Sequence, residues 1–153
     1  MRYIKLKIQN QQLEWLVQFC LKFEMNAKGS RQRSKFIKIL QDKVEDYRNH
    51  RQELIELYAS KDENGNPLII LDNGERCYDV EDKNGYMKEF IELQLEYNYI
   101  NQTEENIKML KIVGDAYLNH EDMFLGIEGD FYHYICIEFE EFFEKQGKEI
   151  SSK

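Results

Sequence analysis

The stretch that decides the fold runs from Ser30 to Tyr58 and reads SRQRSKFIKILQDKVEDYRNHRQELIELY. No proline or glycine interrupts it, so a single helix can continue through all of it. Apolar side chains fall on one stripe of such a helix, at Phe36, Ile37, Leu40, Val44, Tyr47, Leu54, Ile55 and Tyr58. The helix would have roughly eight turns and an axis of about 40 Å, which is long for a small domain. We therefore expect either the rest of the chain or a second molecule to cover it.

The residues before this helix predict a strand followed by a shorter helix. Residues 2–9 alternate between apolar and polar side chains, as a half-buried strand does. Asn10 is expected to cap a helix over residues 11–25. Apolar side chains occupy two flanks of that helix, which indicates burial between two layers. Alternatively, Trp15 and Phe19 form an exposed surface that binds a protein partner.

A hairpin is predicted after the long helix. Residues 68–71 and 76–80 are short strand-like segments on either side of a turn at Asp72-Asn73-Gly74. Helical and strand periodicities then follow each other closely. We expect a helix over residues 86–93 and a strand over residues 95–99.

Two more helices are predicted toward the C-terminus. The first begins in the acidic segment after Asn101 and continues to about Leu118, unless Gly114 breaks it. The second covers residues 131–146, with Asp130 as its cap. Its aromatic side chains would make it a lid on the long helix.

Together these elements predict an α+β fold that is mainly helical. Its helices would pack around one long central helix, beside a small mixed or antiparallel sheet that includes the hairpin. The chain has 153 residues, of which 42% are hydrophobic, enough to bury a core. We expect a single compact domain over residues 1–146 and a flexible C-terminal tail over residues 147–153.

Composition narrows the cellular setting. No apolar run approaches the roughly 18 residues of a membrane span, and the N-terminus lacks the apolar segment of a signal peptide. The three cysteines, Cys20, Cys77 and Cys136, are far apart and include no CxxC pair, so reduced thiols are expected. The interpretation is a soluble cytoplasmic protein that does not associate with membranes.

The charges are divided unevenly along the chain. Residues 1–60 carry 12 Lys and Arg against 7 Asp and Glu, whereas residues 61–153 carry 9 against 22. Either the two halves attract each other within one fold, or the acidic half faces a basic partner.

The start of the long helix is unusually basic, with no acidic residue between Glu24 and Asp42. Gly29 and Ser30 are expected to form the turn and the N-cap there. Free backbone N–H groups after Ser30, together with nearby cations, could bind a phosphate or a carboxylate. This hypothesis assigns anion binding to Lys28, Ser30, Arg31, Arg33 and Lys35. The alternative is that acidic residues of the second half compensate these cations internally.

No motif in the sequence indicates catalysis, a cofactor or a metal. There is no P-loop, no GxGxxG and no nucleophile motif. His120, Glu121 and Asp122 are metal-ligand types, but neighbouring residues of a helix do not point together, so a solvated loop is the better interpretation. Paired glutamates such as Glu138 with Glu141 lack a matching acidic set on a second helix. We therefore predict no metal site and no cofactor, and the sequence favours a non-catalytic role.

Five segments, which cover most of the chain, carry a resemblance to a known family. They are KLKIQNQQLEWLVQF, KGSRQRSKFIKILQDK, LYASKDENGNP, YMKEFIELQLEY and GDFYHYICIEFEEF. The chain resembles a family of small uncharacterised proteins, a domain of unknown function, from tailed phages and prophages of Gram-positive bacteria. The resemblance implies a virus-encoded protein in the cytoplasm of the infected bacterial host, and it supplies no functional residues.

The functional hypothesis is a phage accessory protein that binds another protein, either a host defence protein or a metabolic protein. The partner could come from the host or from the phage, and a homo-oligomer is also compatible with the sequence. One alternative is binding of nucleic acid or a phosphate ligand through the basic helix start, with nucleic acid the less favoured partner. The other is a structural or assembly role in the phage particle.

Overall fold

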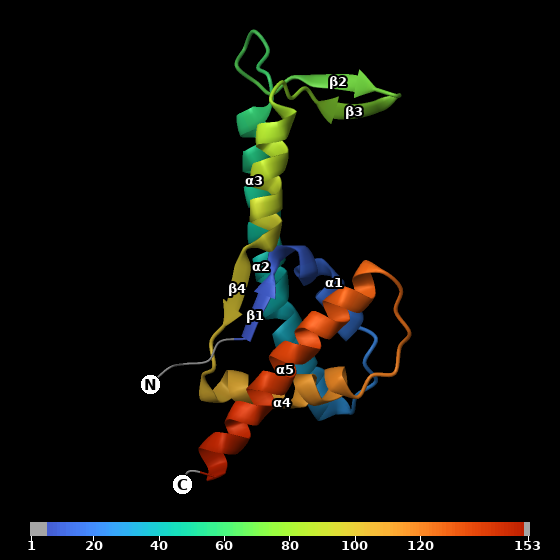
Figure 1. The fold of residues 1–153 in the computed structure, drawn as a ribbon, viewed down its shortest axis with the longest axis vertical. Helices are drawn as coiled ribbons and strands as arrows, with labels where there is room; N and C mark the ends of the chain where they lie inside the picture. The colour runs from blue at the N-terminus through green and yellow to red at the C-terminus, as the bar shows by residue number, and fades with distance from the viewer. Residues whose placement is uncertain (1–5, 152–153) are drawn as a thin grey trace.

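The computed structural model describes residues 6–151, and the side chains as far as Gly147. The predicted long helix is one unbroken helix, α2, Ala27–Tyr58 (Figure 1). Its N-cap is Asn26, whose side chain accepts a hydrogen bond from Gly29 N at 2.8 Å. The prediction of Ser30 as N-cap was therefore wrong. Ser30 lies inside the first turn, where its N–H donates to Asn26 O, because the extended backbone required of a cap occurs at Asn26.

The body of the molecule surrounds about the first two thirds of α2. It contains the helices α1, Asn10–Cys20, α4, Glu104–Leu118, and α5, Ile127–Ser151, and the strands β1, Leu6–Gln9, and β4, Tyr97–Ile100. On α2 the fully buried apolar side chains end at Tyr47. The core therefore covers about the first two thirds of α2, although the apolar stripe continues to its end.

Strands β1 and β4 form an antiparallel pair in which Leu6 lies opposite Ile100. Both of these side chains point into the core. Residues 2–5 of the predicted first strand lie outside the described residues. The helix after β1 begins one residue earlier than predicted, with Gln9 as the N-cap in a capping box with Gln12. The side chain of Asn10 instead donates to Leu93 O at 2.8 Å, which ties α1 to the end of helix α3, Lys83–Leu95.

Helices α4 and α5 close the body. The N-cap of α4 is Thr103, and the helix passes through Gly114 without a break. Helix α5 crosses α4 (Figure 1) and reaches α2 through a ring contact of 6.3 Å between Phe36 and Phe139. It starts before Asp130, and its backbone continues to Ser151. The predicted tail thus begins inside a helix.

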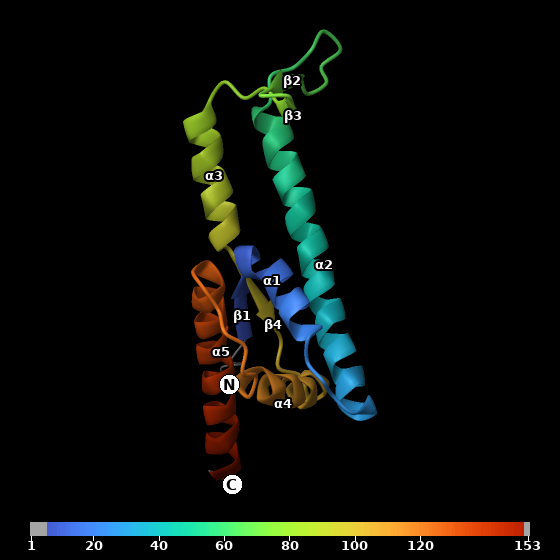
Figure 2. The ribbon, with the colours of Figure 1, turned by 90° about the vertical axis from the view of Figure 1, so that its right-hand side faces the viewer.

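The last third of α2 leaves the body as part of a long arm (residues 48–95), shown in Figure 2. Helix α3, Lys83–Leu95, runs antiparallel beside α2. The predicted hairpin is formed by β2, Ile69–Asp72, and β3, Glu75–Tyr78, at the far end of the arm. In the described part of the chain, β2 and β3 pair with each other and β1 pairs with β4, which makes two separate two-stranded sheets. The mainly helical α+β prediction is confirmed. No described helix contains an apolar stretch long enough to cross a membrane.

Candidate protein-binding surface on the arm

The hairpin exposes a run of aliphatic side chains that we call the hairpin patch: Leu68, Ile69, Ile70 and Leu71. Their exposed fractions range from 37% for Leu68 to 74% for Leu71. A two-stranded sheet has no second layer of its own, and Figure 1 shows none of the described helices or strands lying over the hairpin. The patch is therefore a concentration of apolar surface open to solvent.

The hairpin is nevertheless held firmly to the end of α2. Ser60 N donates to Asp79 O at 2.7 Å, and Leu68 N donates to Ser60 O at 2.7 Å. The side-chain amide of Gln52 on α2 donates to the hydroxyl of Tyr78 at 2.8 Å. At the tip, Asn73 has φ 51° and Gly74 has φ 83°, as a tight two-residue hairpin turn requires. The chain thus presents the patch in a defined orientation.

Helix α3 has two apolar faces, and only one of them is covered by α2. On the covered face, Leu93 is buried and the ring of Tyr86 lies 6.0 Å from that of Tyr58. The other face carries the α3 stripe, Met87, Ile91 and Leu95, at i, i+4 and i+8 with exposed fractions between 45% and 48%. An ordinary surface helix has a single apolar stripe, so the second stripe indicates a surface available to a partner.

A groove of about 360 Å³ runs between α2 and α3, and we call it the arm groove. Its apolar side chains come from three leucines, Leu54, Leu57 and Leu93, and Leu57 is 75% exposed. The remaining lining residues are His50, Glu53, Glu89, Glu92 and Glu96. Within the described part of the chain, none of the four glutamates forms an ion pair with a Lys or Arg. Partial burial and a hydrogen bond with Glu89 raise the pKa of the neighbouring Tyr58 hydroxyl.

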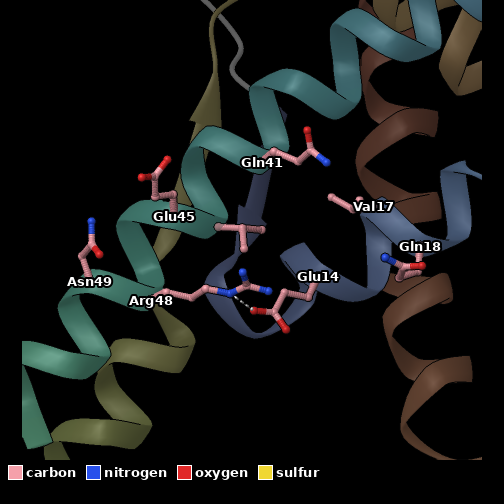
Figure 3. A pocket seen from close by; sticks show the side chains of 8 residues that line it. Glu14, Val17, Gln18, Gln41, Glu45, Arg48 and Asn49 are labelled. Atoms are coloured by element: carbon pink, nitrogen blue, oxygen red, sulfur yellow. Dashed lines mark hydrogen bonds and ion pairs between the residues drawn. The ribbon is translucent and has the colours of Figure 1, made fainter.

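A second, larger groove of about 570 Å³ lies between α1 and α2 (Figure 3). Arg48 spans it, with Nε 3.1 Å from Glu14 Oε1. Arg51 approaches the same oxygen at 3.8 Å and lies over the ring of Tyr47. The other lining residues are mainly amides, with one valine on each helix. The amide side chains can form hydrogen bonds but supply no nucleophile. We interpret this groove as part of the α1–α2 packing.

The structure gives Phe19 a place in the core rather than on the surface. Phe19 is 2% exposed and contacts rings from α1, α4 and α5, while Trp15 stacks on it at 5.1 Å and is partly buried. Phe124 and Phe131 lie against Trp15 because the start of α5 and the loop before it fold over this flank. The predicted exposed surface is therefore absent at Phe19, and burial between two layers is what is found. Partner binding by Trp15 stays a prediction.

The basic start of α2 is partly committed to internal contacts. Arg33 donates to Phe23 O and, at 3.2 Å, to Ser30 Oγ, so it holds the end of the α1 segment. Lys35 pairs with Glu105 of α4 at 3.3 Å, as the internal-compensation alternative predicts. Lys28 and Arg31 are exposed. Anion binding by Lys28, Ser30, Arg31, Arg33 and Lys35 stays a prediction, and the structure does not bring the five side chains together around one point.

The N-terminal part of the chain matches a known protein family. Residues 4–83 match a family described as "Protein of unknown function (DUF1617)", and they make up more than half of the chain. The chain belongs to this family. The DUF1617 match covers β1, α1, α2 and the hairpin and ends where α3 begins. In the same comparisons, no curated protein and no solved structure matched the chain.

The polar clusters outside the arm have local structural explanations. His120 Nε2 lies 3.0 Å from Asp122, which Lys22 also approaches at 3.6 Å, and these contacts lower the pKa of the Asp122 carboxyl. Among the residues that the structure describes, no group of three or more His, Cys, Asp or Glu is placed to hold a metal ion. Burial raises the pKa of the Cys20 thiol, which keeps it protonated at neutral pH.

Sequence reasoning did not identify the arm as a surface. The sequence predicted the hairpin as part of a small sheet, and it left open whether the rest of the chain or a second molecule covers the long apolar stripe of α2. The signal that could have indicated the surface is the presence of two apolar stripes on α3. Tyr86, Phe90 and Leu93 already form the face that packs on α2, so the α3 stripe is a second apolar face with no packing partner assigned to it.

Proposed function

We propose that this DUF1617 protein is a phage-encoded accessory protein that acts in the infected bacterium by binding another protein through its arm, without catalysis. A host defence protein or a metabolic protein is the proposed target. The observation that carries the proposal is the exposed hairpin patch at the end of a rigidly attached arm. The phage origin is supported by the sequence resemblance to proteins of tailed phages and prophages.

Apolar burial gives the arm a source of binding energy. Fully burying one Leu or Ile side chain contributes about 1.5–3 kcal/mol. Leu71, at 74% exposed, and Leu57, at 75% exposed, have most of that contribution still available. Scattered exposed leucines are normal on protein surfaces, whereas the hairpin patch gathers four exposed aliphatic side chains at the end of one arm, Ile69 and Leu71 on one face of the strand and Leu68 and Ile70 on the other.

The test is capture of proteins from a lysate of a Gram-positive host. The immobilised chain is compared with the double variant Ile69→Thr/Leu71→Thr, which removes two apolar side chains of one hairpin face and places threonine, a residue that favours strands, at both positions. The matched control is Met123→Thr/Leu125→Thr, which removes two side chains that are 98% and 91% exposed in the loop before α5. We expect a protein retained by the wild type and the control but lost with the hairpin variant. An identical set of retained proteins on all three surfaces would refute the proposal.

A second candidate function is binding of nucleic acid or a phosphate ligand at the start of α2. The observation that favours it is the exposure of Lys28 and Arg31 beside the first turn of a long helix. Binding of a labelled DNA duplex or of inorganic phosphate should then weaken with added salt and with Lys28→Ala/Arg31→Ala. Insensitivity to both changes would remove this candidate.

A further inference from the structure

We propose that the arm groove binds a basic amphipathic helix of the partner protein, with the apolar side of that helix against the leucines and its Lys and Arg side chains against the glutamates. This inference rests on the proposed function and specifies the chemistry of the partner. It concerns the groove between α2 and α3, which is separate from the hairpin patch.

A helix is the element that fits the shape of the groove. Helices α2 and α3 lie side by side and antiparallel (Figure 2), and two helices packed in this way leave a lengthwise groove. The ridges of a third helix fill such a groove, as in a three-helix bundle, and partner helices bind this way with anchors at i, i+3, i+4 and i+7. The lining residues span His50 to Leu57 on α2 and Glu89 to Glu96 on α3. Each segment makes about two turns and is roughly 11 Å long, so the groove receives about two turns of a partner helix.

The side chains in the groove specify an apolar stripe with cations beside it. Leu57, which is 75% exposed, provides most of the apolar contact, and the partly buried Leu54 and the buried Leu93 also line the groove. The same groove is lined by the glutamates Glu53, Glu89, Glu92 and Glu96. His50 is the one basic residue among its lining residues. Lys or Arg residues flanking the leucine-contacting stripe would therefore be attracted, while an acidic helix would be repelled.

The charge of the whole arm agrees with this assignment. Residues 48–95 carry 6 Lys and Arg against 11 Asp and Glu. The most basic segment of the chain lies at the opposite end of α2, in the body. α1 contacts α2 elsewhere, through Glu14 and Arg48, and meets the groove at its lower end, where Asn10 donates to Glu96 O from its backbone N–H and to Leu93 O from its side chain. The groove is thus open along its length in the described structure.

The experiment measures binding of a defined helical probe to the full chain. The probe is a labelled synthetic peptide of about 18 residues, or five turns, with leucines at i, i+3, i+4 and i+7 and lysines on both flanks. A peptide with glutamate in place of lysine serves as the probe control. Fluorescence anisotropy gives the dissociation constant, and amide chemical shifts of the ¹⁵N-labelled chain locate the site. We expect binding of the basic peptide only, with shifts at residues 50–57 and 89–96.

Two variants separate specific docking from general attraction to an acidic protein. Glu53→Gln/Glu92→Gln/Glu96→Gln and Leu57→Ser change the groove, and the exposure of Leu57 means that folding does not depend on it. The control, Glu24→Gln/Glu63→Gln/Glu121→Gln, changes the net charge equally at exposed positions away from the groove. We expect each groove variant to weaken binding about tenfold or more, equivalent to about 1.4 kcal/mol, and the control to bind like the wild type. Equal binding by the groove and control variants, or shifts outside the groove, would overturn the inference.

Light scattering across a range of concentrations tests the competing occupant, a second copy of the chain. A dimer that the peptide does not dissociate would also overturn the inference, because the groove would then be occupied. Failure of the groove assignment can be distinguished from failure of the proposed function. A partner captured through Ile69 and Leu71 by a protein that binds no basic helix would leave the proposed function standing and remove only the groove assignment.

Discussion

Gly114 of α4 packs directly against Phe139 of α5. A Cβ atom built on Gly114 would lie 2.7 Å from Phe139 Cδ1 and 3.0 Å from Phe143 Cε2, closer than carbon atoms approach without displacement. The two helices therefore cross at a contact that only glycine permits. A glycine inside a helix costs roughly 1 kcal/mol relative to alanine, and here the close approach of the helices offsets that cost.

Substitution of Gly114 by alanine should therefore destabilise the protein even though alanine favours helix. We expect Gly114→Ala to lower the free energy of unfolding by about 1–3 kcal/mol, as for overpacking of a core. Gly147→Ala is the matched control, because Gly147 is also helical and has no neighbouring atom within 4 Å of the added Cβ. It should leave stability unchanged or raise it slightly. Urea unfolding followed by circular dichroism measures both, and equal effects would contradict the close crossing.

The two aromatic residues that the sequence singled out should differ sharply in their effect on stability. Phe19 is 2% exposed among rings of three helices, so Phe19→Ala should cost about 3–5 kcal/mol. Trp15 stacks at the edge of the same cluster and is only partly buried, so Trp15→Ala should cost less. Because Trp15 is the only tryptophan, the comparison uses circular dichroism rather than fluorescence. A small effect of Phe19→Ala would mean that the pair is not part of the core.

Two neighbouring arginines at the start of α2 provide a similar contrast. Arg33 donates hydrogen bonds to Phe23 O and Ser30 Oγ, and hydrogen bonds from charged groups contribute about 1.5–3 kcal/mol. We expect Arg33→Ala to lower the free energy of unfolding by about that amount. Arg31 is exposed, so Arg31→Ala should change it by less than about 0.5 kcal/mol. If the two variants were equally stable, Arg33 would not be holding the α1 segment in place.

Local sequence patterns predicted where the helices and strands lie better than they predicted which of these elements pack or pair with one another. Periodicity and the absence of breakers predicted α2, and the Asn73-Gly74 turn predicted the hairpin. Periodicity cannot say which strand pairs with which, however, and β1 pairs with β4 far along the chain. Asn26 and Ser30 are both good cap residues, and only the backbone conformation at Asn26 decided between them.

The surface could not be predicted because an apolar stripe does not reveal what covers it. The stripe of α2 keeps the same spacing at Phe36 and at Tyr58, yet Phe36 is buried in the core whereas Tyr58 is partly exposed and meets a ring of α3. The same limit applies to Trp15 and Phe19, since the wide apolar face of α1 fitted both burial and exposure. Tertiary packing by α4 and α5 decided for burial at Phe19.

The buried carboxyl of Glu138 should make stability depend on pH. Glu138 on α5 is 7% exposed, and burial raises its pKa above the ordinary value of 4.5. Lys7 opposes that increase in pKa through its backbone N–H and its charge, and the charge of Lys145 opposes it as well. The charge of Glu141 adds to the increase. In the unfolded chain the carboxyl ionises at the ordinary pKa, so the folded state binds more protons between the two pKa values. The contribution of Glu138 to stability is therefore lost as the pH rises through this window.

Glu138→Gln removes that titration and keeps a side-chain oxygen that can accept the Lys7 N–H. The difference in the free energy of unfolding between Glu138→Gln and the wild type should therefore shift in favour of the variant as the pH rises above about 4.5, then become constant. Urea unfolding at a series of pH values measures the difference. Glu121→Gln, at an exposed loop position, reports the effect of the net charge alone. A difference for Glu138→Gln that follows the control at every pH would show that the carboxyl is not desolvated, because a solvated carboxyl would ionise alike in the folded and unfolded chains.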